Sequence, residues 1–163
     1  MQQHPDDEQI ANRVISAYLA FGDYANADRL IRSQLAKTPD DVHALNSQAA
    51  ILLKSGAAAA AIPVLDHVLT LTNLVAARLN RANAQILCRN FAAAETDYLE
   101  LEKTGAESGR VSYGLATIAE HRHDTNQAVR YYQASLNSLP PGTHLWRQAS
   151  VRLQVLEAHS ETK

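Results

Sequence analysis

Apolar residues recur along this chain at helical spacing, in stripes separated by short polar turns. One stripe near the N-terminus consists of Ile10, Val14, Tyr18 and Phe21, and a second consists of Ala27, Leu30, Ile31 and Leu35. Residues three or four positions apart lie on one face of an α-helix, so each stripe predicts an amphipathic helix. No segment of useful length alternates apolar and polar residues as a strand would. The pattern therefore predicts an all-α protein.

The same pattern continues along the chain and predicts nine helices. Eight of them form pairs at about residues 8–21 and 24–37, 41–55 and 58–71, 74–88 and 91–103, and 108–122 and 125–138. The ninth covers about residues 143–158, and Thr143 is its expected N-cap because a hydroxyl can accept from the free N–H groups of a first turn. Pro63 falls inside the predicted helix 58–71, where it removes one backbone hydrogen bond.

A short turn joins the two helices of each pair, and its sequence recurs. In the first turn Gly22 can take a positive φ because it lacks a Cβ, and Asp23 can cap the next helix. Gly56 occupies the same place in the second pair, and Arg89 and His123 occupy it in the third and fourth. Four equivalent turns indicate an internal repeat, which we expect to be looser in the C-terminal half, where the glycine is lost.

Side-chain size at fixed places after each turn supports the repeat. Small residues follow the turns at Ala27, Ala61, Ala94 and Ala128, and larger ones lie four residues further on, at Ile31, Leu65, Tyr98 and Tyr132. Two helices approach closely only where one of them presents a small side chain. The alanines are therefore expected where the two helices of each pair cross.

These helix–turn–helix repeats, with Pro39 and Pro140 near the ends of the first and the last, resemble the tetratricopeptide repeat. The resemblance covers about residues 8–140, in repeats at about 8–40, 41–73, 74–106 and 108–141. It implies a single domain over residues 1–163, built as an α–α superhelix of antiparallel helical hairpins. The helix at about 143–158 would then cap the last hairpin with Leu145, Trp146, Ala149, Leu153 and Leu156. The chain departs from the family pattern at Ala11, where a large aromatic residue is usual.

The resemblance also implies a function, that of a non-enzymatic scaffold or adaptor whose first helices line a concave groove for a peptide or protein segment. By the family's geometry, the groove positions are the first-helix residues outside the packing positions, namely Asn12, Arg13, Ser16, His43, Asn46, Ser47, Leu79, Asn80, Asn83, Tyr113, Thr117 and Arg147. Two alternatives remain open. One is a module that self-associates into a homo-oligomer, and the other is a small secretion or pilus-assembly chaperone.

Asn12, Asn46 and Asn80 follow one another at equal intervals, one repeat length apart, and form a column of amides. A side-chain amide both donates and accepts, so such a column can pair with the backbone of an extended peptide of any sequence. The alternative is that these are tolerated polar residues on the first helices, with the third repeat shifted by one residue. The two-carboxylate clamp of chaperone-binding family members is absent, because its places hold Asn12, Ser16, Ser47, Ala76 and Asn80.

Charge and composition narrow the classes of partner and chemistry. A net charge of −2 with scattered Lys and Arg argues against nucleic acid and anionic membrane surfaces as partners. Cys88 is the single cysteine, which excludes an internal disulfide and a multi-cysteine metal site. His121 and His123 are interpreted as solvated turn residues rather than metal ligands, and no nucleophile elbow or Gly-rich phosphate loop occurs. We therefore expect no enzyme activity, no cofactor and no metal.

The N-terminal eight residues are polar and acidic, without the basic start and apolar core of a signal peptide. The longest run of small apolar residues, about 57–64, is too short to span a bilayer. We expect a soluble protein without membrane insertion that resides in the cytoplasm, or in the periplasm if the chain is a trimmed form of a longer one.

Overall fold

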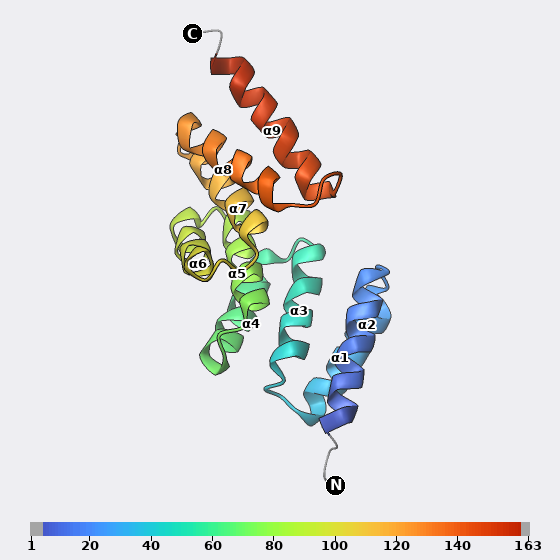
Figure 1. Ribbon diagram of the computed structural model, residues 1–163. Coiled ribbons are helices and arrows are strands. Elements are labelled where there is room, and N and C mark those ends of the chain that lie inside the picture. The colour runs from blue at the N-terminus through green and yellow to red at the C-terminus, as the bar shows by residue number, and fades with distance from the viewer. Residues whose placement is uncertain (1–4, 161–163) are drawn as a thin grey trace. The chain divides into compact units, whose positions relative to one another are not determined.

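The computed structural model describes the backbone of residues 5–160 and the side chains of residues 8–158, and all regular structure in this part is helical (Figure 1). The helices are α1 (Pro5–Ala20), α2 (Tyr24–Lys37), α3 (Val42–Lys54), α4 (Ala58–Leu71), α5 (Val75–Leu87), α6 (Phe91–Thr104), α7 (Ser108–His121), α8 (Thr125–Ser138) and α9 (His144–Ser160). The all-α prediction and its nine helices are confirmed within the described residues. The largest difference in bounds is at α1, which begins at Pro5 rather than near residue 8.

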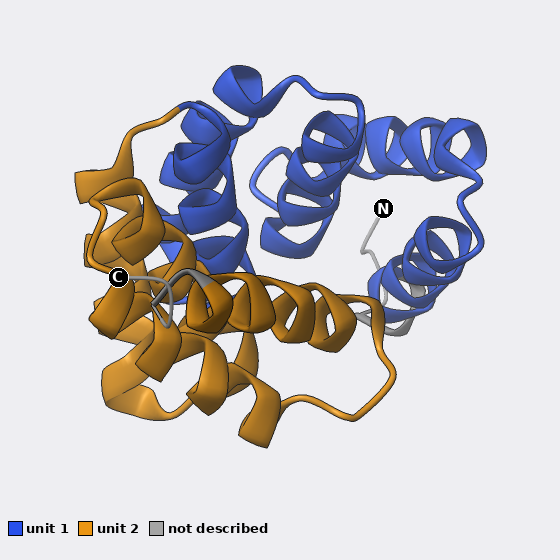
Figure 2. Ribbon diagram, turned by 90° about the horizontal axis from the view of Figure 1, so that it is seen from above, with its two compact units in different colours: residues 1–88 blue, residues 89–163 orange. Residues whose placement is uncertain are grey.

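The chain divides into two compact units, residues 1–88 and residues 89–163, which Figure 2 shows in different colours. In unit 1, each of helices α1 to α5 packs on the next, and α3 also packs on α1 and on α5. In unit 2, each of helices α6 to α9 packs on the next. Within each unit this order of packing is that of an α–α superhelix. The single domain over residues 1–163 stays a prediction.

The turns between paired helices share one backbone conformation, with or without glycine. Gly22 and Gly56 have φ values of 76° and 80°, and Arg89 and His123 hold the left-handed region at 62° and 60°. The turn at His123 also repeats the hydrogen bond of the first, because Asp124 N donates to Ala119 O at 3.0 Å as Asp23 N does to Tyr18 O at 2.9 Å. The loss of glycine in the C-terminal half therefore leaves the turn conformation unchanged at His123, where tertiary packing holds a strained residue in place.

The predicted N-caps are present. The carboxylate of Asp23 accepts from Asn26 N at 3.2 Å at the start of α2. The hydroxyl of Thr143 accepts from Trp146 N at 3.3 Å at the start of α9. Pro63 lies inside α4 as expected.

The core follows the positions that the repeat predicted. The four alanines after the turns are fully buried, and the larger residues four positions on are at most 1% exposed: Ala27, Ala61, Ala94 and Ala128, with Ile31, Leu65, Tyr98 and Tyr132. On α9, Ala149 is fully buried, and Leu153 and Leu156 pack with it on the cluster of Ala128 and Tyr132. The ninth helix thus covers α8, as the sequence predicted.

Most of the apolar stripe of α1 lies on the surface, contrary to the expected packing role, and only its Tyr18 packs against the core. Ile10 is 57% exposed, Val14 39% and Phe21 89%, whereas Ile15 on another face of the helix is fully buried. Ile15 packs in a cluster with Ala27, Ile31 and Ala44. α1 is the first helix that the structure describes, and the described part of unit 1 leaves Ile10, Val14 and Phe21 exposed.

Two glycines inside α7 bring its neighbours unusually close. A Cβ at Gly114 would overlap the buried ring of Tyr98 on α6, and a Cβ at Gly109 would come within 2.7 Å of Leu139 Cγ. The hydroxyl of Ser135 on α8 donates to Gly109 O at 2.8 Å, and Ser135 is fully buried. These contacts fix α7 against both neighbours and so position the side chains that α7 presents on its other faces.

Candidate functional site

Two of the three asparagines in the predicted column of unit 1 are hydrogen-bonded to each other. Asn80 Nδ2 on α5 donates to Asn46 Oδ1 on α3 at 2.9 Å, so two of the three predicted amides bind each other. The assignment of amide N and O follows this hydrogen bond. One donor group of Asn46 and the acceptor of Asn80 remain available to a ligand. The pair therefore acts first as a tie between neighbouring first helices.

Asn12 occupies the remaining position of the column, on α1. Its Oδ1 is buried and has no hydrogen-bond partner among the described residues. The hydroxyl of Ser16 donates to the backbone carbonyl of Asn12 at 2.9 Å and leaves that amide oxygen unsatisfied. A buried acceptor without a donor costs about 1–3 kcal/mol, so this position is the least satisfied of the column.

The other predicted groove residues of unit 1 differ in exposure. Arg13, His43 and Asn83 are exposed, as is Ser16, and Ser47 is half-buried. Leu79 is only 4% exposed, so its side chain is a core residue and not a surface contact. Leu45 holds the equivalent place one repeat earlier and is 9% exposed, so both leucines occupy the packing face of their helix. The structure corrects the groove assignment at Leu79.

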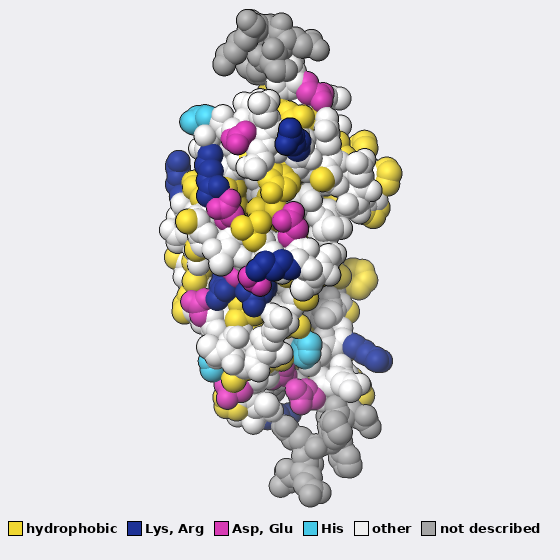
Figure 3. Space-filling model, turned by 60° about the vertical axis from the view of Figure 1, so that its left-hand side comes forward, with side chains coloured by type: hydrophobic (Ala, Val, Ile, Leu, Met, Phe, Trp, Pro, Cys, Tyr) yellow, Lys and Arg dark blue, Asp and Glu magenta, His cyan; other side chains and the backbone are white. Residues whose placement is uncertain are grey.

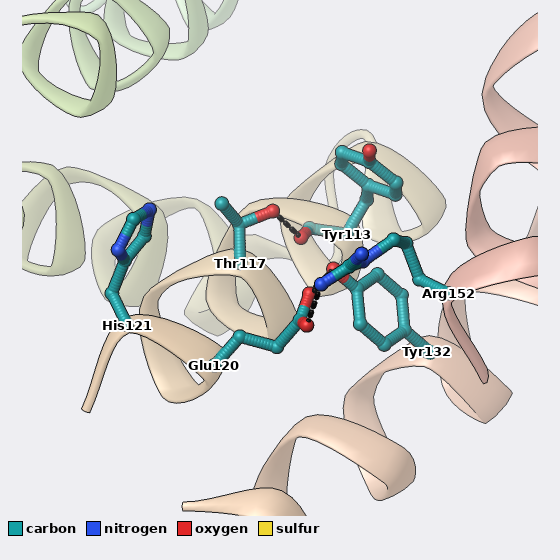
Figure 4. A pocket seen from close by; sticks show the side chains of 6 residues that line it. All are labelled: Tyr113, Thr117, Glu120, His121, Tyr132 and Arg152. Carbon is teal, nitrogen blue, oxygen red and sulfur yellow. Dashed lines mark hydrogen bonds and ion pairs between the residues drawn. The ribbon is translucent and has the colours of Figure 1, made fainter. Parts of the chain in front are cut away.

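Unit 2 contains an open cavity of about 320 Å³ between α7, α8 and α9 (Figure 4). Its lining consists of Tyr113, Thr117, Glu120 and His121 from α7, Tyr132 from α8 and Arg152 from α9. Thr117 Oγ1 donates to Tyr113 O at 3.0 Å, which holds this hydroxyl against its own helix. Positions 113, 117 and 120 share one face of α7, so the helix period gathers them on the cavity wall.

Glu120 is the centre of the polar network in this cavity. The Arg152 guanidinium donates to both carboxylate oxygens, and the Tyr132 hydroxyl donates to one of them. Burial raises the pKa of Glu120, but the hydrogen bonds from Arg152 and Tyr132 outweigh it and hold that pKa below its usual value. The carboxylate is therefore ionised at neutral pH, and it fixes the arginine in place.

The two tyrosines of the cavity form the aromatic part of its wall. The rings of Tyr113 and Tyr132 meet edge to face, with centroids 5.6 Å apart. Burial raises the pKa of both hydroxyls, and for Tyr132 the bond to Glu120 raises it further. Both hydroxyls stay protonated at neutral pH. In Figure 4 the hydroxyl of Tyr113 points away from the Glu120 carboxylate.

A second cavity of about 380 Å³ adjoins the first, because Tyr113 and Arg152 line both. His144, Arg147, Gln148 and Val151 complete its lining. The Arg147 guanidinium is anchored through Nε and Nη2 on Gly142 O, at 2.9 and 2.7 Å. We call the two cavities together the Tyr113 pockets.

The Tyr113 pockets bring together three of the groove residues predicted from the sequence, Tyr113, Thr117 and Arg147. Sequence reasoning missed Glu120 and Arg152, and it placed Tyr132 in the core without its polar role. Glu120 follows Tyr113 and Thr117 at helical spacing, so the helix period alone could have placed it on the same face. No sequence signal paired Glu120 with Arg152, because they lie far apart in the chain, on α7 and α9.

Other surface features carry less chemistry. On the face drawn in Figure 3, basic, acidic and apolar side chains are interspersed, without an extended field of one sign. Among the described residues no cluster of three or more His, Cys, Asp and Glu side chains is arranged to hold a metal ion. Within the same part of the chain, every helix is too short or too polar to cross a bilayer.

Comparison with protein-family models gives no match for this chain, and comparison with curated proteins gives none either. The assignment of a function therefore depends on the geometry described above.

Proposed function

We propose that this chain is a non-enzymatic scaffold of the tetratricopeptide type that binds a peptide or protein segment on the inner face of its helical hairpins. The observation that carries the proposal is the pair of Tyr113 pockets, where α7 and α9 present aromatic, aliphatic and cationic groups together. Cavities that combine an apolar wall with a few fixed polar groups are the usual form of a binding site. A cytoplasmic location belongs to the same proposal.

The polar groups of the Tyr113 pockets are suited to binding more than to catalysis. Glu120 is ionised and already accepts hydrogen bonds from Arg152 and Tyr132, so it is not poised as a general acid or base. Anchored guanidinium groups and an aromatic wall are instead the elements of a pre-organised docking site. These features support a scaffold over an enzyme.

A displayed random peptide library selected on the full-length chain tests the proposal. The selected peptides are then titrated against variants at two exposed valines of α9. Val151 lines the Tyr113 pockets and is 58% exposed, whereas Val155 is 38% exposed and lies outside them. We expect Val151→Gln to weaken binding about fivefold or more, which corresponds to about 1 kcal/mol, and Val155→Gln to leave it nearly unchanged. Failure to select any peptide, or equal effects of the two variants, would contradict the proposed function.

Two amides of unit 1 provide a second test of the groove. Because Asn46 and Asn80 bind each other, replacing both with Ala removes the tie without leaving a lone buried partner. If the column contributes to peptide binding, the double variant weakens it more than Asn137→Ala does, at an exposed asparagine of α8 outside the predicted groove. If the double variant and the control variant bind the peptide with equal affinity, Asn46 and Asn80 have only a structural role.

Self-association is a second candidate function, and the exposed stripe of α1 favours it. Ala44 holds the place of Ile10 in the next repeat and is fully buried against α1 and α2, so Ile10 occupies a position that the next repeat uses for stacking. Light scattering should then show an oligomer for the wild-type chain and a monomer of 17.8 kDa for Phe21→Ser. A wild-type monomer at all concentrations would exclude this candidate.

A further inference from the structure

We infer that the Tyr113 pockets bind a segment in which a large apolar side chain is flanked by acidic residues. The inference rests on the proposed function, because it specifies the partner's chemistry at the same site. It follows from the charge of the lining, the hydrogen-bond donors that the two arginines leave unused, and the character of the second cavity.

The charged side chains that line the Tyr113 pockets are two guanidinium groups, Arg147 and Arg152, and one carboxylate, Glu120, so their balance is positive. The Glu120 charge is compensated by Arg152, with which it forms an ion pair. The charge of Arg147 has no acidic partner in the lining, so the pockets favour an anionic ligand group and disfavour a basic one.

Both arginines retain donors that are directed by bonds already made. Arg152 uses Nε and Nη2 on Glu120, and Arg147 uses Nε and Nη2 on the carbonyl of Gly142. A guanidinium has five N–H groups, so both arginines keep donors beyond these bonds. Arg152 is also within reach of the Tyr132 hydroxyl, whereas Nη1 of Arg147 has no partner among the described residues. Because the guanidinium groups are already anchored, a carboxylate that binds Nη1 orders little additional side chain.

The second cavity supplies the apolar half of the recognition. Its wall consists of the Tyr113 ring, the exposed side chain of Val151 and the aliphatic stems of Arg147, Arg152 and Gln148. A volume of about 380 Å³ is at the lower end of ligand pockets, which suits one large side chain rather than a whole small molecule. Arginine stems and an aromatic ring together favour an aromatic ligand residue such as Phe.

Four matched peptides test this inference by fluorescence polarisation with the full chain. All are acetylated and amidated, so that their ends carry no charge, and they differ only in a central triplet: Glu-Phe-Glu, Gln-Phe-Gln, Glu-Ala-Glu or Lys-Phe-Lys. We expect the first peptide to bind about tenfold more tightly than the second and the third, and the fourth to bind weakest. Raising the salt from about 50 to about 300 mM should reduce this advantage over Gln-Phe-Gln, because the rim charges are screened.

Two arginine variants locate the effect. Arg147→Gln should remove most of the preference for Glu over Gln, whereas Arg130→Gln, at an exposed arginine of α8 outside the pockets, should leave it intact. Arg152 is unsuitable for this test because its removal leaves Glu120 without its ion-pair partner. Amide shifts of Tyr113 and Val151 on titration confirm that the peptide occupies the pockets.

The outcomes separate this inference from the proposed function. If Gln-Phe-Gln binds the pockets as tightly as Glu-Phe-Glu, the acidic specificity is wrong and the peptide-binding proposal stands. An unchanged preference in Arg147→Gln, or tightest binding by Lys-Phe-Lys, would also overturn the inference. If none of the four peptides shifts the pocket amides, the inference is wrong, and the library selection described above decides the proposed function.

Discussion

Gly114 is the position where a single methyl group should disturb unit 2 most. The substitution Gly114→Ala places a Cβ against the ring of Tyr98, which is 1% exposed. Overpacking a rigid core costs about 1–3 kcal/mol, and here the upper part of that range applies because the obstacle is a ring rather than a flexible chain end. Alanine regains up to about 1 kcal/mol of helix propensity over glycine. The net loss should be about 1–2 kcal/mol.

Trp146, the only tryptophan of the chain, lies on α9 and reports on unit 2 by fluorescence. Thermal unfolding followed by this signal should show Gly114→Ala melting about 2–8 °C below the wild-type chain. The pair Gly114→Ala and Tyr98→Leu should lose less stability than the sum of the single variants, because the leucine removes the obstructing ring.

Gly109→Ala is the matched control on the same helix. Its new Cβ meets Leu139 Cγ at 2.7 Å and the backbone N of Leu139 at 3.2 Å, a milder overlap than that with the Tyr98 ring, so a smaller loss than at Gly114 is expected. If Gly114→Ala melts at or above the wild-type temperature, the close approach of α6 and α7 at Tyr98 is refuted.

Three further predictions concern the turn, the core and the polar network. His123→Gly should raise the free energy of unfolding, measured in urea, by about 0.5–1 kcal/mol, because the residue at φ 60° no longer carries a Cβ. A lower free energy of unfolding would show that His123 is not strained. Ser135→Ala should cost about 1 kcal/mol in the same assay, since it removes the buried side-chain hydrogen bond to the carbonyl of Gly109. The pKa of Glu120 is lower in the folded than in the unfolded chain, so its bond with Arg152 stabilises above about pH 4.5 and is lost as the pH falls through the folded value. Glu120→Gln should therefore reduce the fall in the free energy of unfolding as the pH is lowered below about 4.5. An unchanged dependence on pH would exclude this contribution.

The repeat could be predicted from the sequence because its signals are local. Helix period, turn glycines and the four buried alanines each depend on residues within one hairpin, so the helices and the packing positions followed directly. The turn at His123 shows the limit of local reasoning. The sequence indicated a lost glycine, but the fold holds histidine in the same left-handed conformation because the flanking helices α7 and α8 are packed together.

The candidate site could be predicted only in part. Tyr113, Thr117 and Arg147 were expected on the inner face, since each position follows from the helix period and the family's geometry. The role of Glu120 and the burial of Leu79 could not be predicted. Both depend on which side chains of neighbouring helices pack against these two residues.

The amino-acid sequence by itself determined the secondary structure, the repeat and the core of each hairpin, because these arise from contacts between residues close together in the chain. The tertiary structure alone decided three further features: the bond between Asn46 and Asn80, the exposure of the α1 stripe, and the network around Glu120. Each is set by the neighbours that a helix acquires, or does not acquire, when the described hairpins stack. A side chain's polarity and spacing indicate its face on a helix, and only the stacked fold determines what that face meets.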